Sequence, residues 1–180
     1  MNWITKFIKP KIKSLLKKKL SDSKEALWVT CECKNLIYKD ELFNNLSVCP
    51  SCGFHHKLNC EERFKIFFDD KEYEILETPL PKDDPLKFPK YSDKLKQSRE
   101  KTKQSDAILI ADGMLDGIRI TSGAQNFNFI GGAVGAASGE AFIHGIQHAI
   151  NNKTPFIFFS CSGGQKMQEG AIALMQMTRT

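Results

Sequence analysis

The sequence predicts an α/β fold that is preceded by a small zinc ribbon. From Asp106 onward the chain is apolar and glycine-rich, and its pattern indicates strand, strand, helix, strand and helix in that order. Glycine pairs stand at two strand-to-helix junctions, and two cysteine pairs precede this region. We therefore expect four segments: a basic arm and linker (1–27), a zinc ribbon (28–58), connecting helices with a Pro-rich loop (59–105), and the first part of the α/β domain (106–180).

The basic arm carries the positive charge of the chain. Residues 1–20 contain seven lysines and no acidic residue, whereas the whole chain has a net charge of +5, so the remainder is slightly acidic. This distribution argues against general nucleic-acid binding by the main body. Apolar residues lie between the lysines at roughly helical spacing, interrupted by Pro10. A membrane-surface helix, a transit peptide and a solvated arm all remain open. No apolar run reaches the ~18–20 residues of a membrane span.

Two cysteine pairs predict the metal site. Cys31 and Cys33 are followed by Cys49 and Cys52, and the second pair has the sequence Cys-Pro-Ser-Cys-Gly. Four thiolates in two close pairs can surround one structural Zn²⁺ per chain. Six cysteines without a signal peptide also favour a reducing compartment, and we expect a cytoplasmic protein.

The first cysteine pair is irregular, because one residue separates its members instead of two. In an extended strand such residues have Cα atoms about 6.5 Å apart, which is too far for two ligands of one zinc. The backbone at Glu32 must therefore bend if both cysteines bind the metal. His55, His56 and Cys60 are the reserve ligands, and reduced, buried thiols are the alternative to a metal site.

The elements before the α/β region are short. Apolar residues predict strands at 36–38 and at 46–48. Phenylalanines at i, i+3 and i+4 predict a helix around residues 64–68. Four prolines make residues 78–92 a loop, and the charged stretch 92–105 favours a surface helix.

The α/β region itself begins with two strands, 107–111 and 118–122. We expect a turn at Asp112-Gly113 and Asp116-Gly117 to join them. A helix should follow the Gly131-Gly132 pair and run to about Ile150.

The continuous apolar run 155–160 predicts a buried strand. After Gly163-Gly164 a second helix should begin, with Leu174, Met175 and Met177 on its apolar face. The chain stops within this helix without a capping residue, which we interpret as truncation.

Two loops could carry chemistry, 126–135 and 159–170. Free N–H groups where a strand gives way to a helix can bind a phosphate or stabilise a forming oxyanion. The alternative is tight chain reversal and close packing, because Gly131, Gly135 and Gly139 at spacing four would let another element approach the helix.

Several other chemistries lack support in the sequence. It contains no P-loop, no dinucleotide fingerprint and no nucleophile elbow. Cys161 could act as a nucleophile with His144 or His148, but a lone cysteine in an apolar strand is usually a small core residue. Glu169, near a helix start, is better interpreted as a partner of the helix dipole or a packing ligand than as a general base.

The order of these motifs resembles a known family. The zinc module is followed by residues 84–88 (Asp-Pro-Leu-Lys-Phe), Lys101-Thr102, residues 127–132 (Phe-Asn-Phe-Ile-Gly-Gly) and residues 162–169 (Ser-Gly-Gly-Gln-Lys-Met-Gln-Glu). Together they resemble the β subunit of bacterial-type acetyl-CoA carboxylase carboxyltransferase over essentially the whole chain. The family usually has Cys-x-x-Cys in the first knuckle and often Ala-Arg where this chain has Gln-Lys, and its members continue well past residue 180.

The resemblance implies a crotonase-like spiral of strand-strand-helix units. It implies transfer of a carboxyl group from carboxybiotin, on the biotin carboxyl carrier protein, to acetyl-CoA, which forms malonyl-CoA for fatty acid biosynthesis. An α subunit in an α2β2 complex and biotin carboxylase would be the partners. Gly163 and Gly164 would be catalytic and Gly131 and Gly132 substrate-binding, with activity only in the presence of the α subunit and a C-terminal half.

Two alternatives stay open at this point. One is a crotonase-fold acyl-CoA enzyme without biotin, such as a hydratase, against which the zinc ribbon argues. The other is a zinc-ribbon nucleic-acid-binding protein that uses residues 54–57 (Phe-His-His-Lys) beside the knuckle. Stacking aromatic residues interleaved with Arg and Lys are sparse there.

Overall fold

A computed structural model of the chain describes residues 27–180, so the expectations for the basic arm fall almost wholly outside the described residues. The chain divides between Lys57 and Leu58 into two compact units, which are described separately. Within residues 27–180, no helix combines the length and the apolar character that crossing a membrane requires.

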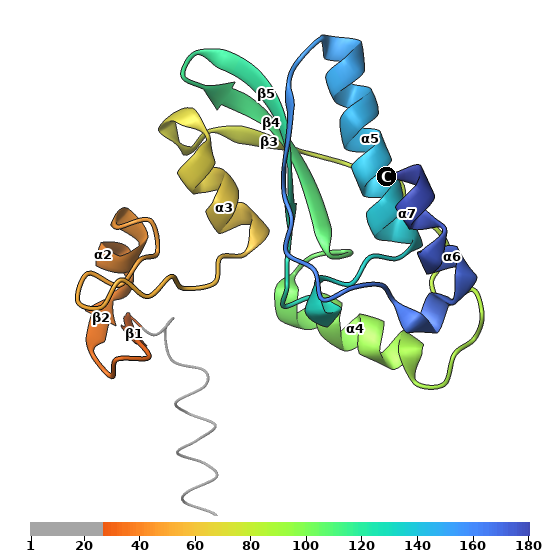
Figure 1. The fold of residues 1–180 in the computed structure, drawn as a ribbon, viewed down its shortest axis with the longest axis horizontal. Helices are drawn as coiled ribbons and strands as arrows, with labels where there is room; N and C mark the ends of the chain where they lie inside the picture. The colour runs from red at the N-terminus through yellow and green to blue at the C-terminus, as the bar shows by residue number, and fades with distance from the viewer. Residues whose placement is uncertain (1–26) are drawn as a thin grey trace, which may run out of the picture. The chain divides into compact units, whose positions relative to one another are not determined.

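The first unit is a β-hairpin with one short helix (Figure 1). Strands β1 (Trp28–Thr30) and β2 (Leu36–Tyr38) pair antiparallel, and helix α2 (Lys39–Asn44) follows directly. The prediction of a strand at residues 46–48 is wrong. Its first two residues lie in the turn after α2, and Val48 forms only an isolated bridge with His55.

The second unit contains a four-stranded sheet in the order β3-β4-β5-β6 (Figure 1). Its strands are β3 (Tyr73–Leu76), β4 (Ile108–Leu115), β5 (Ile118–Gln125) and β6 (Phe156–Phe159). The first three are antiparallel neighbours, and β6 runs parallel to β5. A parallel pair requires a crossover connection, and helix α5 (Ala136–Asn152) supplies it.

The strands β4 and β5 are longer than predicted, and β3 was not predicted. Only Asp116-Gly117 turns the chain, whereas Asp112-Gly113 lies inside β4. Gly113 is needed there because a Cβ atom would lie 2.6 Å from the ring of Phe68. The glycine thus serves close packing rather than a turn.

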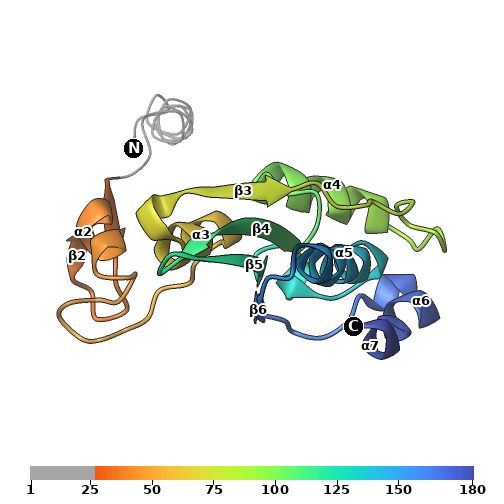
Figure 2. The same ribbon diagram turned by 90° about the horizontal axis from the view of Figure 1, so that it is seen from above.

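Helices α3 (Cys60–Phe67) and α5 cover opposite faces of this sheet (Figure 2). Alternate residues of β4 meet them: Leu109 and Ala111 belong to the cluster with α3, and Ile108 and Ile110 to the cluster with α5. The predicted helices at these two places are confirmed. A capping box between Asn59 and Glu62 begins α3, with both hydrogen bonds at 2.9 Å.

The predicted surface helix is α4 (Tyr91–Thr102), and one side of it is buried. Tyr91 and Leu95 pack against Ala107 and Phe129. The strand β6 was expected to be buried, but all four of its residues are half-buried because it lies at the edge of the sheet.

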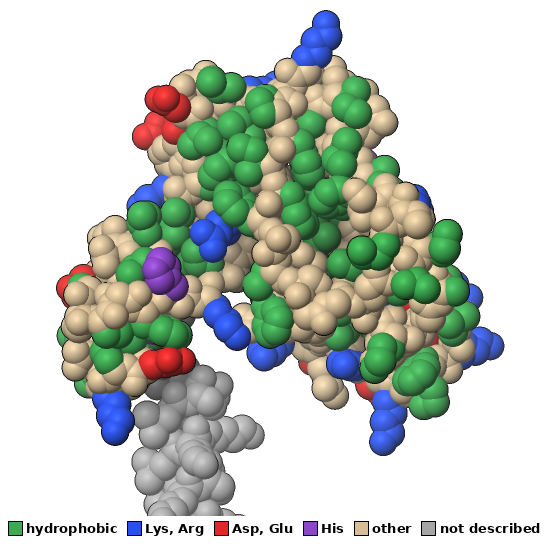
Figure 3. All heavy atoms as spheres, in the orientation of Figure 1, with side chains coloured by type: hydrophobic (Ala, Val, Ile, Leu, Met, Phe, Trp, Pro, Cys, Tyr) green, Lys and Arg blue, Asp and Glu red, His purple; other side chains and the backbone are tan. Residues whose placement is uncertain are grey.

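The C-terminal segment forms short helical turns instead of one helix. These are η3 (Met167–Glu169), α6 (Ala171–Leu174) and α7 (Gln176–Arg179). Figure 3 shows hydrophobic side chains gathered over α6 and α7. Leu174, Met175 and Met177, which were predicted to form the apolar face of a single helix, are exposed on these turns.

Candidate functional site

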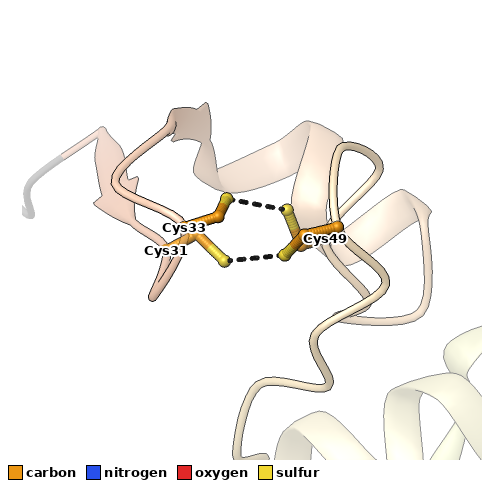
Figure 4. A group of neighbouring side chains, drawn as sticks. Cys31, Cys33 and Cys49 are labelled. Atoms are coloured by element: carbon orange, nitrogen blue, oxygen red, sulfur yellow. Dashed lines mark hydrogen bonds between the residues drawn. The ribbon is translucent and has the colours of Figure 1, made fainter.

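The four predicted cysteines lie together in the first unit (Figure 4). The four Sγ atoms are all within 4.8 Å of one another. The Sγ atoms of Cys31 and Cys52 are 3.6 Å apart, and those of Cys33 and Cys49 are 3.9 Å apart. Ligands at ~2.3 Å around a tetrahedral zinc stand about 3.8 Å from each other. The four sulfur atoms therefore lie close enough together to bind one Zn²⁺.

The irregular first pair is accommodated by a turn after Cys31. Glu32 lies in this turn, where Lys34 N–H donates to the Cys31 carbonyl oxygen at 2.9 Å. Cys31 N–H in turn donates to the carbonyl oxygen of Asn35 at 3.0 Å, and Lys34 has a φ of 68°. The predicted bend at Glu32 is confirmed, and it brings both thiols to the metal.

The thiols of the second pair differ in acidity. Burial raises the pKa of Cys49, but hydrogen bonds from the backbone at Cys52 and Ser51 outweigh it and lower the pKa to about 7. A backbone hydrogen bond from Phe54 lowers the pKa of Cys52, yet its contact with the Cys49 thiol and burial raise it to about 12. Of these two cysteines, Cys49 thus loses its proton more easily before the metal binds.

The reserve ligands are not needed. Cys60 belongs to the second unit, where its Sγ donates to the Ala124 carbonyl oxygen at 3.1 Å. Burial raises the pKa of this thiol to about 11, so it stays protonated in the core. His55 is exposed, and His56 meets the Phe54 ring edge-on at 5.1 Å.

In the second unit, the two glycine loops lie side by side. Gly163 N–H donates to the Gly131 carbonyl oxygen at 2.8 Å, and Val134 N–H donates to that of Gly164 at 2.9 Å. Lys166 N–H donates to Val134 at 2.9 Å, which completes a short parallel pairing. The loops predicted separately from the sequence therefore form one continuous surface.

The side chain of Gln125, the last residue of β5, is hydrogen-bonded to both loops. Its Nε2 donates to the Gly132 carbonyl oxygen at 2.6 Å, and its Oε1 accepts from Cys161 N–H at 3.1 Å. The side chain is buried, so one amide satisfies a polar group in each loop. Sequence reasoning missed this residue, because a polar side chain at the end of a strand that also contains Arg, Thr and Ser gives no distinct signal.

The predicted site glycines have different roles in the geometry. A Cβ on Gly132 would lie 2.1 Å from the Cys161 carbonyl oxygen, so the loops can approach only at a glycine. Gly163 N–H is engaged by Gly131, as described above. Gly164 has a φ of 128°, and its N–H meets only the exposed Ser162 hydroxyl, at 3.1 Å.

A buried charge cluster lies behind the loops. The ammonium group of Lys166 is 2.5 Å from Asp106 Oδ2 and 3.8 Å from Glu169 Oε1, and all three side chains are at most 7% exposed. Ser138 donates from its hydroxyl to the other oxygen of Asp106. Because the cluster holds two carboxylates and one ammonium, it needs further donors.

Glu169 finds those donors at helix α5 and helix α4. Its Oε2 accepts from Ala136 N–H at 2.7 Å, at the first residue of α5, where the helix dipole favours negative charge. Its Oε1 accepts from the Tyr91 hydroxyl at 2.6 Å. Burial and this hydrogen bond raise the pKa of Tyr91 well above its usual range. Glu169 is thus the partner of a helix dipole, but of α5 and not of the helix that was expected to follow Gly163-Gly164.

Close packing also explains two glycines of the spacing-four series. A Cβ on Gly135 would lie 2.6 Å from the Glu169 carboxylate and from the stem of Lys166. One on Gly139 would lie 2.0 Å from Gln176 Oε1. A Cβ on Gly131 would meet no atom within 4 Å, and its φ of 66° is what favours glycine there.

Cys161 is exposed, so the expectation of a small core residue is wrong. It follows β6 instead of lying in it, at the point where the chain leaves the sheet. His148 Nε2 is 2.7 Å from Asp112 Oδ2, and this carboxylate also accepts from Arg119 Nε at 3.1 Å. His148 is thus paired with Asp112 on β4, and Nδ1 of His144 has no hydrogen-bond partner within residues 27–180. Neither histidine is hydrogen-bonded to Cys161 among these residues, so the cysteine nucleophile gains no support.

Comparison with known proteins agrees with both halves of this description. Residues 28–52 match the acetyl-CoA carboxylase zinc finger domain, and residues 83–180 match the carboxyl transferase domain. The chain belongs to the carboxyl transferase family. Within it, the chain is similar to the β subunits of acetyl-CoA carboxylase carboxyltransferase, and Cys31, Cys33, Cys49 and Cys52 form the four-cysteine site of the matched zinc finger domain.

Curated relatives of that name cover the whole chain. The β subunit of Pelagibacter ubique is 44% identical over 187 residues, which cover 100% of this chain and 60% of the relative. The β subunit of Azorhizobium caulinodans is 44% identical over 184 residues, which cover 100% of this chain and 61% of the relative. The chain thus spans about three fifths of the length of these relatives.

Solved structures show the same fold at low identity. A transcarboxylase 12S structure with methylmalonyl-coenzyme A bound is 21% identical, with a TM-score of 0.56 over 68% of this chain and 22% of that one. A Pseudomonas malonate decarboxylase hetero-tetramer is 20% identical, with a TM-score of 0.50 over 68% and 44%. These likenesses concern the fold alone, and with the family match they identify the crotonase-like α/β fold.

Proposed function

We propose that this chain acts as the β subunit of an acetyl-CoA carboxylase carboxyltransferase. It would transfer a carboxyl group from carboxybiotin to acetyl-CoA, so that malonyl-CoA forms for fatty acid biosynthesis. The observation that carries this proposal is the pairing of the two glycine loops at the start of α5. The order of zinc finger and carboxyl transferase domains supports it.

The geometry suits a reaction in which charge develops on carbonyl oxygens. Carboxyl transfer places negative charge on the thioester oxygen of the CoA substrate and on the ureido oxygen of biotin. Backbone N–H groups that are already oriented stabilise such charge without a side-chain acid. In the proposed site, Gly164 N–H is the donor, because a substrate oxygen can replace its single exposed partner, the Ser162 hydroxyl.

The other three site glycines hold this donor in place. Gly163 ties the turn to Gly131, and Gly132 allows the close approach of the loops. We propose that Gly131 and Gly132 border the bound substrate. The biotin nitrogen can itself take up the substrate proton, so the site requires no His–Asp pair among the loops.

The wider assembly is part of the proposal. An α subunit in an α2β2 complex, the biotin carboxyl carrier protein and biotin carboxylase are the proposed partners, in the cytoplasm. Exposed apolar side chains on α6 and α7, next to the glycine turn, are consistent with a further protein surface there (Figure 3).

The alternatives gain no support from the structure. The zinc finger match is specific to acetyl-CoA carboxylase, which disfavours a hydratase without biotin. In residues 27–57 the basic and acidic side chains are equal in number, so the ribbon lacks the basic surface that nucleic-acid binding requires. The basic residues are Lys34, Lys39 and Lys57, and the acidic residues are Glu32, Asp40 and Glu41.

Substitution of Gly164 tests the proposal. Gly164→Val should lower malonyl-CoA-dependent carboxylation of free biotin by roughly 10²–10³-fold in the enzyme assembled with its α subunit, because valine does not adopt the φ of 128° and the backbone N–H donor is misdirected. Gly117→Val is the matched control, since Gly117 has a φ of 74° and equally open surroundings in the remote β4–β5 turn. Activity of Gly164→Val equal to that of the control would remove this loop from the mechanism.

A further inference from the structure

The side-chain amide of Gln165 is buried without a partner. Both its Nε2 and its Oε1 are closed off from solvent, and neither makes a hydrogen bond with any residue in 27–180. A carboxamide carries two N–H donors and a carbonyl acceptor, and leaving them all unpaired in the interior is unfavourable. Native structures rarely retain an unpaired buried polar group without a function, and binding of a ligand is one such function.

Gln165 lies within the proposed site. It stands between the exposed Gly163-Gly164 turn and Lys166, and it forms the parallel bridge with Val134 of the other glycine loop. The side chain of Lys166 points into the buried charge cluster. Successive side chains of an extended segment point to opposite sides, so Gln165 faces away from that cluster.

The chemistry of the amide restricts what can pair with it. Its donor and its acceptor lie side by side, so a fully complementary ligand must also present an N–H donor and an acceptor side by side. A cyclic urea does so, because its ring holds the N–H and the carbonyl in the cis arrangement. The secondary amides of a CoA pantetheine arm are trans and place the two groups on opposite sides. The adenine of CoA also offers such a pair, and its binding to Gln165 would change the KM for malonyl-CoA instead of the KM for biotin.

We infer that Gln165 binds the ureido ring of biotin through two parallel hydrogen bonds, an inference that rests on the proposed function. The amide N–H donates to the ureido oxygen, and the amide oxygen accepts from the ring N–H. Carboxylation occupies only one ring nitrogen, so the pair forms with biotin and with carboxybiotin. Because the ureido oxygen gains charge when the carboxyl group leaves, the N–H donor also assists the transfer.

Entry of the ring requires the turn that precedes Gln165 to move. The turn from Cys161 to Gly164 is exposed at all four residues, and Gly164 lies in a backbone region that side chains rarely adopt. Its downstream end is fixed by the buried Lys166. Binding at Gln165 therefore requires this turn to open and to give up the hydrogen bonds of Gly163 with Gly131 and of Gly164 with Val134, while Lys166 stays in the charge cluster.

The experiment compares Gln165→Met with the matched control Gln147→Met in the assembled carboxyltransferase. Gln147 is exposed on α5, where its amide meets Asn151 at 3.0 Å. Gln165→Met removes an unpaired buried amide, so its Tm should rise by about 2–4 °C. The KM for free biotin should rise about ten- to a hundredfold, while the KM for malonyl-CoA stays constant. Gln165→Glu, which loses the donor, should also lower kcat.

Each outcome decides the matter. If the wild-type complex does not carboxylate biotin, the proposed function fails and this inference fails with it. If the wild type is active and Gln165→Met leaves the biotin KM unchanged, the inference alone is overturned. A fall in Tm with both KM values raised would show a structural role, and a rise confined to the malonyl-CoA KM would assign the amide to CoA. Either result would also overturn it.

Discussion

Removal of the buried ammonium group is the most severe test of the cluster behind the glycine loops. Lys166→Met keeps the length of the side chain but leaves Asp106 and Glu169 without their cation. Breaking a buried ion pair by removing one partner destabilises proteins by about 3–5 kcal/mol. Lys166 is 1% exposed and 2.5 Å from Asp106, so solvent cannot compensate the loss. We expect the Tm of the second unit to fall by about 10–15 °C.

Circular dichroism is the suitable measurement for this variant. The two tryptophans of the chain, Trp3 and Trp28, both precede the second unit, so tryptophan fluorescence reports elsewhere. Lys94→Met, at an exposed position of α4, is the control and should change stability by less than about 0.5 kcal/mol. In the double variant with Asp106→Asn, part of the loss should be recovered. A Lys166→Met protein as stable as the control would refute the reasoning.

Three further outcomes follow from the structure. Cys33→Ser should lose zinc, and elemental analysis showing an unchanged one zinc per chain would exclude Cys33 as a ligand. Gly132→Ala should be more destabilising than Gly131→Ala in thermal unfolding, because only the former places a Cβ 2.1 Å from the Cys161 carbonyl oxygen; equal effects would contradict this. Burial raises the pKa of Cys60 from 9.0 to about 11, so the folded state holds the proton more tightly and stability is lost as pH rises from 9 to 11. Between pH 8 and pH 10, the free energy of unfolding measured in urea should fall less for Cys60→Val than for wild type. An equal fall in both proteins would argue against burial of the Cys60 thiol.

Local patterns were sufficient for the longer strands, for the crossover helix and for the metal site. Apolar runs with turn residues predict β4, β5 and α5, and the spacing of four cysteines predicts their meeting at one zinc. The strand β3 escaped prediction because it is four residues long and two of them are exposed. The Asp112-Gly113 pair was misassigned because the reason for its glycine is the ring of Phe68, which is distant in sequence.

Local sequence patterns could not predict the contacts of the polar groups around the loops. Asp106, Gln125 and Lys166 each look ordinary in the sequence, because each stands beside other polar residues near the end of a strand or within a loop. Their meaning comes from contacts over long sequence separations, such as Lys166 with Asp106 and Gln125 with Cys161. Burial of a charge becomes evident only when the fold brings its partner to it.

The cluster also explains how an exposed glycine turn can hold a precise shape. A buried charged side chain is stable only where it contacts groups of opposite charge. The segment that carries Lys166 can therefore take only one position along the chain relative to Asp106 and the start of α5. An apolar side chain at the same place could slide along its neighbours with little change in free energy. The ion pairs thus fix one end of the turn, and Gly163 with Gln125 fixes the other to the Gly131–Gly132 loop. Between these anchors Gly164 can adopt a φ of 128° and still present its N–H in a constant direction, which is what stabilisation of a developing charge requires.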